Sequence, residues 1–157
     1  MTSELESGAR AKLCAIALAL AAIPATALAT LGQDETSAAS DRVQLRAKHA
    51  VRPAAGYAID ELQLPSGTTV REFISPEGKV FAVAWQGPVL PDLRQILGDA
   101  TFQRYTNREL SPRVSRSHRS LRQPDLVIES GGRVRAFRGM AYVPALLPAG
   151  VTESDIR

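Results

Sequence analysis

The residue types that could perform nucleophilic or metal chemistry are few in this chain. It has one cysteine, Cys14, and two histidines, His49 and His118. A serine hydrolase needs a base, usually histidine, and the chain has no G-x-S-x-G elbow beside either one. Zinc needs three or four closely spaced ligands, which two distant histidines do not supply. The sequence therefore predicts no catalytic residue, no metal site and no cofactor.

Paired carboxylates are the remaining route to acid–base chemistry. Glu72, Asp92, Asp125 and Glu129 are scattered over the expected fold. A hydrolase of the glycosidase kind would need two carboxyl groups about 5–10 Å apart in a concave pocket. Four scattered acids also arise by chance. A small exported carboxylate-dependent hydrolase that uses Asp92, Asp125 and Glu72 is therefore the alternative hypothesis.

The turn after one apolar stretch carries the only tryptophan, Trp85. At the end of a central strand, Trp85 could form the floor of a ligand cleft with Gln86 and Asp92. The interpretation that we favour is an aromatic side chain that packs a helix against a sheet.

Arginines gather between residues 104 and 122. Guanidinium groups bind phosphate and carboxylate, so this segment could bind lipid headgroups, acidic polysaccharide or nucleic acid. Tyr105 is the one aromatic residue among them, which argues against nucleic acid. The chain has 16 arginines and 3 lysines, so a solvated loop in an arginine-rich chain is the interpretation we favour. The arginines of this run are Arg104, Arg108, Arg113, Arg116, Arg119 and Arg122.

The N-terminus has the pattern of a secretory signal. A polar segment with Arg10 and Lys12 precedes an uncharged run over residues 13–29, which ends in small residues. This pattern predicts cleavage after Ala29 and delivery to the periplasm or the cell exterior. Lys12 argues against lipidation of Cys14. An uncleaved membrane anchor is the alternative.

The chain as a whole has the composition of one folded domain. Of 157 residues, 45% are hydrophobic and 22% charged, with a formal net charge of +3. These values exclude a disordered chain, a collagen, a coiled coil and a polytopic membrane protein. A single cysteine excludes a disulfide framework. We expect residues 30–55 to be a loose N-terminal segment and residues 56–157 to be one domain with an Arg-rich loop at 104–122.

Three short segments that end in glycine predict hairpin loops: Pro65–Gly67, Pro76–Gly78 and Ser130–Gly132. The first loop sets Leu62 opposite Val70, and the second sets Phe73 opposite Phe81. One conflict follows, because the first loop also sets Asp60 opposite Glu72. The predicted strands are 57–64, 69–75, 79–86, 125–130 and 133–142.

The third predicted strand is apolar on both faces, which indicates that both faces are covered. A helix begins at Pro91, has Leu93, Ile96 and Leu97 on one face, and ends at Gly98. The expected fold is α+β. It has a five-stranded antiparallel sheet (a three-strand meander, the helix, then a hairpin) with one main helix packed on it.

Several stretches together resemble a known bacterial family. They are 64–73, 81–88, 91–98, 123–132, 135–137 and 147–151. As a set they are similar to the exported family catalogued as domain of unknown function 2844. The resemblance implies a secreted or periplasmic protein and no assigned activity.

We therefore expect a non-enzymatic binding or accessory module of the cell envelope. Its partner would be an envelope protein or an anionic surface component, and a homo-oligomer is a further option. Membrane contact is expected only through the signal segment before cleavage, and nucleic acid is not an expected partner. The candidate binding residues are Trp85, Gln86, Asp92, Arg108, Arg113, Arg116 and Arg119.

Overall fold

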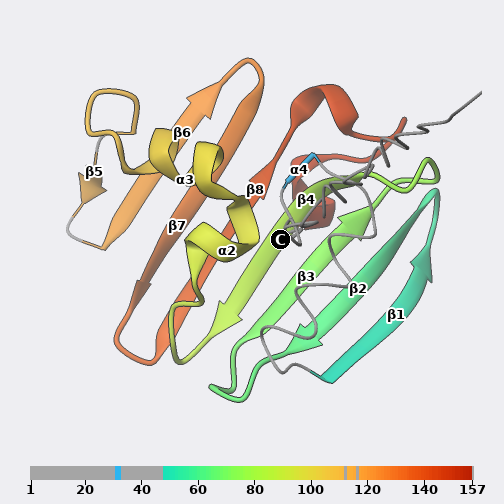
Figure 1. Cartoon of the computed structure of the whole chain (residues 1–157), viewed down its shortest axis with the longest axis horizontal. Coiled ribbons are helices and arrows are strands. Elements are labelled where there is room, and N and C mark those ends of the chain that lie inside the picture. The colour runs from blue at the N-terminus through green and yellow to red at the C-terminus, as the bar shows by residue number, and fades with distance from the viewer. Residues whose placement is uncertain (1–30, 33–47, 112, 116, 157) are drawn as a thin grey trace, which may run out of the picture.

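The computed structural model describes residues 31–32, 48–111, 113–115 and 117–156. Within these residues the strands form one antiparallel sheet in the order β1-β2-β3-β4-β8-β7-β6-β5 (Figure 1). The strands are β1 (Lys48–Ala54), β2 (Tyr57–Gln63), β3 (Thr69–Ile74), β4 (Val80–Gly87), β5 (Arg113–Ser115), β6 (His118–Gln123), β7 (Leu126–Arg133) and β8 (Ala136–Tyr142). The helices are α2 (Leu93–Leu97), α3 (Asp99–Thr106), the 3-10 turn η1 (Pro144–Leu146) and α4 (Glu153–Ile156).

The α+β class and the antiparallel sheet are confirmed, but the expected count of five strands is wrong. The structure adds β1, β5 and β6. Strand β1 lies at one edge of the sheet with most of its side chains exposed, so it lacks the alternation that reveals a half-buried strand. Strand β6 buries only Leu121. The expected loose segment 30–55 thus contains β1, and the expected loop 104–122 contains the end of α3 as well as β5 and β6.

The first two hairpins have nearly the predicted register. Leu62 pairs with Val70, and Asp60 does lie opposite Glu72. In the second hairpin a shift in register between Phe73 and Ile74 pairs Phe73 with Ala82 instead of the expected Phe81. This irregularity leaves the rings of Phe73 and Phe81 6.1 Å apart in the same core cluster.

The third loop is not where the double glycine predicted it. Strand β7 continues through Ser130–Gly132, and the turn is formed by Val134 and Arg135. A Cβ atom on Gly132 would lie 2.3 Å from the carbonyl oxygen of Ala136, so no other residue fits at this point of the ladder. The glycine pair therefore permits close strand approach and does not form the turn.

The sheet is covered on both faces by different parts of the chain. On one face, Val83 and Trp85 pack with residues of α2 and α3, which lie over β7 and β8 in Figure 1. On the other face, Phe73 and Phe81 pack with Ile156 of α4. All residues of β4 from Val80 to Trp85 are buried, which confirms the two covered faces expected for this strand. No helix among the described residues has the length and apolar character needed to cross a bilayer.

Candidate functional site

The C-terminal segment covers only part of the second face of the sheet. Cross-strand pairs place Thr69, Gln86, Arg138, Gly131 and His118 in one row across five strands. The next row on this face, two residues away in each strand and toward α4, contains Arg71, Ala84, Met140 and Glu129. The row after it contains Phe73, Ala82 and Tyr142, which are buried near α4. Within the described part of the chain, this face therefore changes from covered and apolar to uncovered and polar. We call the uncovered part, with side chains of Thr69, Arg71, Gln86, His118 and Arg138, the open face.

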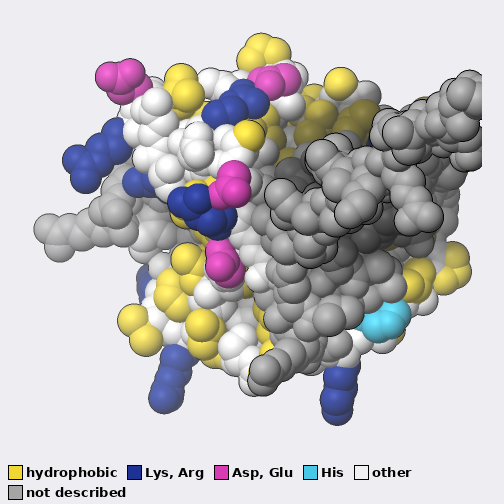
Figure 2. Space-filling model, in the orientation of Figure 1, with side chains coloured by type: hydrophobic (Ala, Val, Ile, Leu, Met, Phe, Trp, Pro, Cys, Tyr) yellow, Lys and Arg dark blue, Asp and Glu magenta, His cyan; other side chains and the backbone are white. Residues whose placement is uncertain are grey.

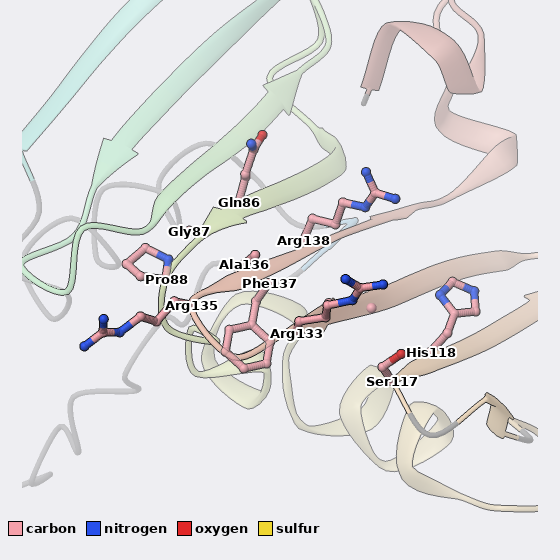
Figure 3. Close-up of a pocket in the computed structure, with 12 residues that line it drawn as sticks. Gln86, Gly87, Pro88, Ser117, His118, Arg133, Arg135, Ala136, Phe137 and Arg138 are labelled. Carbon is pink, nitrogen blue, oxygen red and sulfur yellow. The ribbon is translucent and has the colours of Figure 1, made fainter.

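A hollow of about 690 Å³ lies over the first row. Figure 3 shows Gln86, Arg138 and His118 projecting to the same side of the ribbon from β4, β8 and β6. Arg133 and Arg135 also line the hollow. An adjoining hollow of about 300 Å³ includes Arg71 and Glu129 and shares Gln86, Arg138 and His118 with the first. The larger hollow has three arginines, one histidine and no carboxylate in its lining.

Among the described residues, no carboxylate pairs with Arg71, Arg133, Arg135 or Arg138. Two acids lie near these arginines and form ion pairs elsewhere. Glu61 pairs with Arg52 although it is opposite Arg71 in the β2–β3 ladder, and Glu129, which lines the smaller hollow, pairs with Arg122. Guanidinium groups gathered around one concave surface attract anions and can bind carboxylate or phosphate in a bidentate manner. The geometry of the open face therefore suits an anionic ligand.

His118 stands directly over a glycine of the neighbouring strand. A Cβ atom on Gly131 would lie 2.8 Å from Nδ1 of His118, so the imidazole occupies the space that a side chain at position 131 would fill. Since the ring is only partly buried, it remains accessible from the hollow that it lines. The double glycine thereby shapes the floor of the hollow.

Trp85 and Gln86 both line the smaller hollow, but Asp92 lines neither hollow, so the three residues do not form one cleft. The side chains of Trp85 and Gln86 point to opposite faces of the sheet, as those of consecutive strand residues do. Trp85 is 1% exposed and belongs to the core under α2 and α3, whereas Gln86 is exposed on the open face. A Cβ atom on Gly139 would lie 2.2 Å from Cζ2 of Trp85, so the indole packs onto this glycine. Asp92 is exposed and caps α2, where its Oδ1 accepts hydrogen bonds from the backbone N–H of Arg94 at 2.9 Å and of Gln95 at 3.2 Å.

Three arginines of the run at 104–122 form structural contacts, and two of them, Arg104 and Arg119, contact α3 or extend from it. Arg104 donates to both carboxylate oxygens of Asp125 at 2.8 Å, and this hydrogen-bonded pair lowers the pKa of Asp125. Arg119 donates to the carbonyl oxygen of Tyr105 at 3.1 Å, with its guanidinium 5.4 Å from the ring centroid. These contacts tie α3 to the β6–β7 hairpin.

Arg122 joins the sheet to the C-terminal helix. Its guanidinium pairs with Glu129 of β7 and with Glu153 of α4. The hydroxyl of Tyr142 donates to Oε2 of the same Glu153 at 3.1 Å. Burial, followed by the Glu153 contact, raises the pKa of Tyr142. This network anchors the segment that covers the apolar part of the second face.

The other candidates in the run are not gathered into a described site. Arg108 is exposed in the connection after α3. Arg113 lies in β5, for which only the backbone is described, and Arg116 lies outside the described residues. Of these three arginines, only Arg108 has a described side chain, and it lines neither hollow.

The three carboxylates of the hydrolase hypothesis lie in separate places. Glu72 is 1% exposed in β3, Asp125 pairs with Arg104, and Asp92 caps α2. None of the three lines either hollow described above. Within the described residues, no group of three or more His, Cys, Asp or Glu side chains is arranged to hold a metal ion.

The sequence analysis missed His118, Arg133, Arg135 and Arg138 as residues of a common site. His118 and Arg138 each align with Gly131 in the ladder, and this alignment follows only from the correct β6–β7 and β7–β8 registers. A two-residue turn at Val134–Arg135 would have predicted the second of these registers. The signal was therefore present, but the double glycine indicated a different turn.

Comparison with known proteins identifies a family. The family model described as "Protein of unknown function (DUF2844)" matches residues 27–156. No curated protein and no solved structure matches the chain. The chain belongs to the DUF2844 family, as the sequence motifs indicated.

Proposed function

We propose that this DUF2844 protein is an exported, non-enzymatic binding module of the cell envelope, and that its open face holds an anionic envelope component. The observation that supports this proposal most strongly is the set of arginines around the two hollows. Arg71 and Arg138 have no carboxylate partner among the described residues, although carboxylates elsewhere in the sheet are paired. Such groups are ready to bind an anion without first breaking an internal ion pair.

The rigidity of the supporting sheet also favours binding. Gln86, Arg138 and His118 come from three strands whose hydrogen-bonded order is fixed by the buried residues behind them. A surface built on strands keeps its side chains at constant spacing, so little ordering cost arises when a ligand binds. A repeating polyanion could then contact several strands at once.

Export is supported by the N-terminal signal pattern, and the contacts of Leu31 and Gly32 agree with cleavage after Ala29. Leu31 is buried in the core, and the backbone N–H of Gly32 donates to the carbonyl oxygen of Val80 at 2.8 Å. Both residues lie just after the expected cleavage site at Ala29. Cleavage there would retain these contacts in the mature protein, and N-terminal sequencing of the protein recovered from the periplasm or medium tests this site.

The binding proposal is tested by titrating the protein with an oligomer of galacturonic acid, which carries one carboxylate per sugar. A neutral glucose oligomer of equal length serves as the ligand control, and calorimetry gives Kd at low and high salt. We expect binding of the acidic oligomer alone, weakened by salt. Replacing Arg138 by Gln should weaken it about tenfold, the effect of losing one charge-assisted hydrogen bond.

The matched control is Arg108→Gln, which removes the same charge from an exposed arginine in the run at 104–122. If Arg108→Gln weakens binding and Arg138→Gln does not, the binding surface lies in that run and the open face is the wrong assignment. Equal affinity for the neutral oligomer would contradict the proposed charge recognition.

A further inference from the structure

A second surface lies at the end of the sheet where β7 turns into β8. The described residues leave five large hydrophobic side chains exposed, and three of them are at this end: Val134 at 86%, Val89 at 49% and Leu90 at 42%. Val134 stands between Arg133 and Arg135 in the hairpin turn. Pro88, which precedes Val89, lines the same hollow as both arginines, so the two loops are neighbours. We call Val89, Leu90, Arg133, Val134 and Arg135 the tip.

Hydrogen bonds to the buried Thr68 fix the loop that carries Val89 and Leu90. The hydroxyl of Thr68, a residue that is 0% exposed, donates to the carbonyl oxygen of Val89 at 2.6 Å and accepts from its N–H at 3.3 Å. A Cβ atom on Gly87 would lie 2.4 Å from Cα of Thr68, so the two backbones are in close contact. These contacts fix the backbone of the loop in the conformation that exposes Val89 and Leu90.

The β7–β8 turn has an arginine at a position whose left-handed backbone conformation favours glycine or asparagine. Arg135 has φ 66°, and it is the one non-glycine residue with positive φ among the described residues. Glycine or asparagine normally occupies such a position because a Cβ atom makes this conformation unfavourable. An arginine here places a second guanidinium beside Val134, at the outermost point of the hairpin.

Acidic turns lie at the opposite end of the sheet. The β3–β4 turn contains Glu77 and the β6–β7 turn contains Asp125, and both connect strand ends remote from the β7–β8 turn. In Figure 2, one basic side chain projects from the lower left edge beside a group of hydrophobic ones, near the end where β7 turns into β8 in Figure 1. Asp92 is the acid next to the tip, and its carboxylate is occupied in capping α2.

We propose that the tip docks on a membrane surface rich in anionic phospholipid. Arg133 and Arg135 would contact phosphate groups, while Val134, Val89 and Leu90 would enter the interface. Basic and aliphatic side chains in alternation suit the boundary between headgroups and acyl chains. An acidic polysaccharide would use the charges but leave the aliphatic side chains without a role, since sugars stack on aromatic rings. Docking by the tip would place the open face beside the membrane. Arg133 and Arg135 also line the larger hollow, so the two surfaces share these arginines, whereas Val134, Val89 and Leu90 belong to the tip alone.

Sedimentation with vesicles tests this proposal. Vesicles of phosphatidylcholine with about one third phosphatidylglycerol are compared with vesicles of phosphatidylcholine alone, using the protein in the form in which it is recovered after expression. We expect at least tenfold stronger partitioning to the anionic vesicles. The double variant Arg133→Gln/Arg135→Gln should lose at least fivefold of this binding, and Val134→Ser about threefold.

Two matched controls keep the test specific. Val51→Ser changes another exposed valine, 55% exposed in β1, and Arg108→Gln removes an exposed arginine outside the tip. Both should bind vesicles like the parent, and equal melting temperatures would show that all variants are folded. Vesicle binding that survives both tip variants would overturn the proposal and assign the contact to residues 13–29 or to another surface. So would equal binding to neutral vesicles.

Discussion

Two groups of arginines in this protein have opposite surroundings. In the run at 104–122, Arg104, Arg119 and Arg122 contact Asp125, Tyr105 and a pair of glutamates, so each joins two elements of the fold. Around the β7–β8 turn, Arg133, Arg135 and Arg138 have no carboxylate partner among the described residues. Arginines of the denser cluster in the sequence therefore stabilise the fold, whereas those of the smaller cluster are the ones that we propose for ligand binding.

The comparison shows that the register of strands decides what a charged residue does. Arg122 aligns with Val127 and reaches glutamates on β7 and α4. Arg138 aligns with Gln86 and Gly131, which offer it no negative charge. Local density of arginine in the sequence carries no information about these neighbours.

The largest expected effect separates the two regions by stability. Leu121, within the arginine run, is 0% exposed, while Val134 at the tip is 86% exposed. We expect Leu121→Ala to lower the free energy of unfolding by about 2–5 kcal/mol, because a buried cavity forms. Val134→Ala should change it by less than about 0.5 kcal/mol. Urea unfolding followed by circular dichroism measures both, and similar losses in the two variants would contradict the comparison.

A smaller effect distinguishes the arginines themselves. Arg122→Met removes one ion-pair partner from each of Glu129 and Glu153 and should cost about 1 kcal/mol, the sum expected for two partly exposed ion pairs. Arg138→Met, which removes no ion pair within the described residues, should leave the free energy of unfolding nearly unchanged. The same unfolding measurement applies. If Arg138→Met destabilises the protein more than Arg122→Met does, Arg138 stabilises the fold and its proposed role as a free binding residue is wrong.

The smallest expected effect is a pH dependence. The Arg104 contact lowers the pKa of Asp125 in the folded protein below its unfolded value of about 4. The stability from this pair is therefore present above that pH and is lost as the pH falls through the folded pKa. The difference in unfolding free energy between the parent and Asp125→Asn should shrink on acidification below about pH 4. A difference independent of pH would show that the pair contributes no linked stability.

Much of the fold was predictable from the sequence because its local signals agree with each other. The loop Pro65–Gly67 set the first hairpin register, and the apolar run 80–85 marked the central strand. Gly98 marked the end of α2, although the helix begins at Leu93, two residues after the predicted Pro91. In each case turn chemistry, periodicity and burial give the same answer.

The candidate site was less predictable because it depends on contacts distant in sequence. Strand β6 buries a single leucine among polar residues, so its strand character comes from pairing with β7. The turn at Val134–Arg135 breaks the usual residue preference at Arg135, and the adjacent glycines offered a more ordinary turn. The open face combines residues from strands on both sides of the β7–β8 turn, whose position was predicted wrongly, so it could not be assembled from the sequence alone.

Trp85, the only tryptophan of the chain, also has an optical consequence. Its indole is 1% exposed, and its Nε1 has no hydrogen-bond partner within the described residues. Intrinsic emission should therefore come from one apolar environment, at short wavelength, and shift to the red when the chain unfolds. Because the indole rests on Gly139 between β4 and β8, this emission reports on the pairing at the centre of the sheet. Folding of every variant proposed above can be followed by this one signal without an added label.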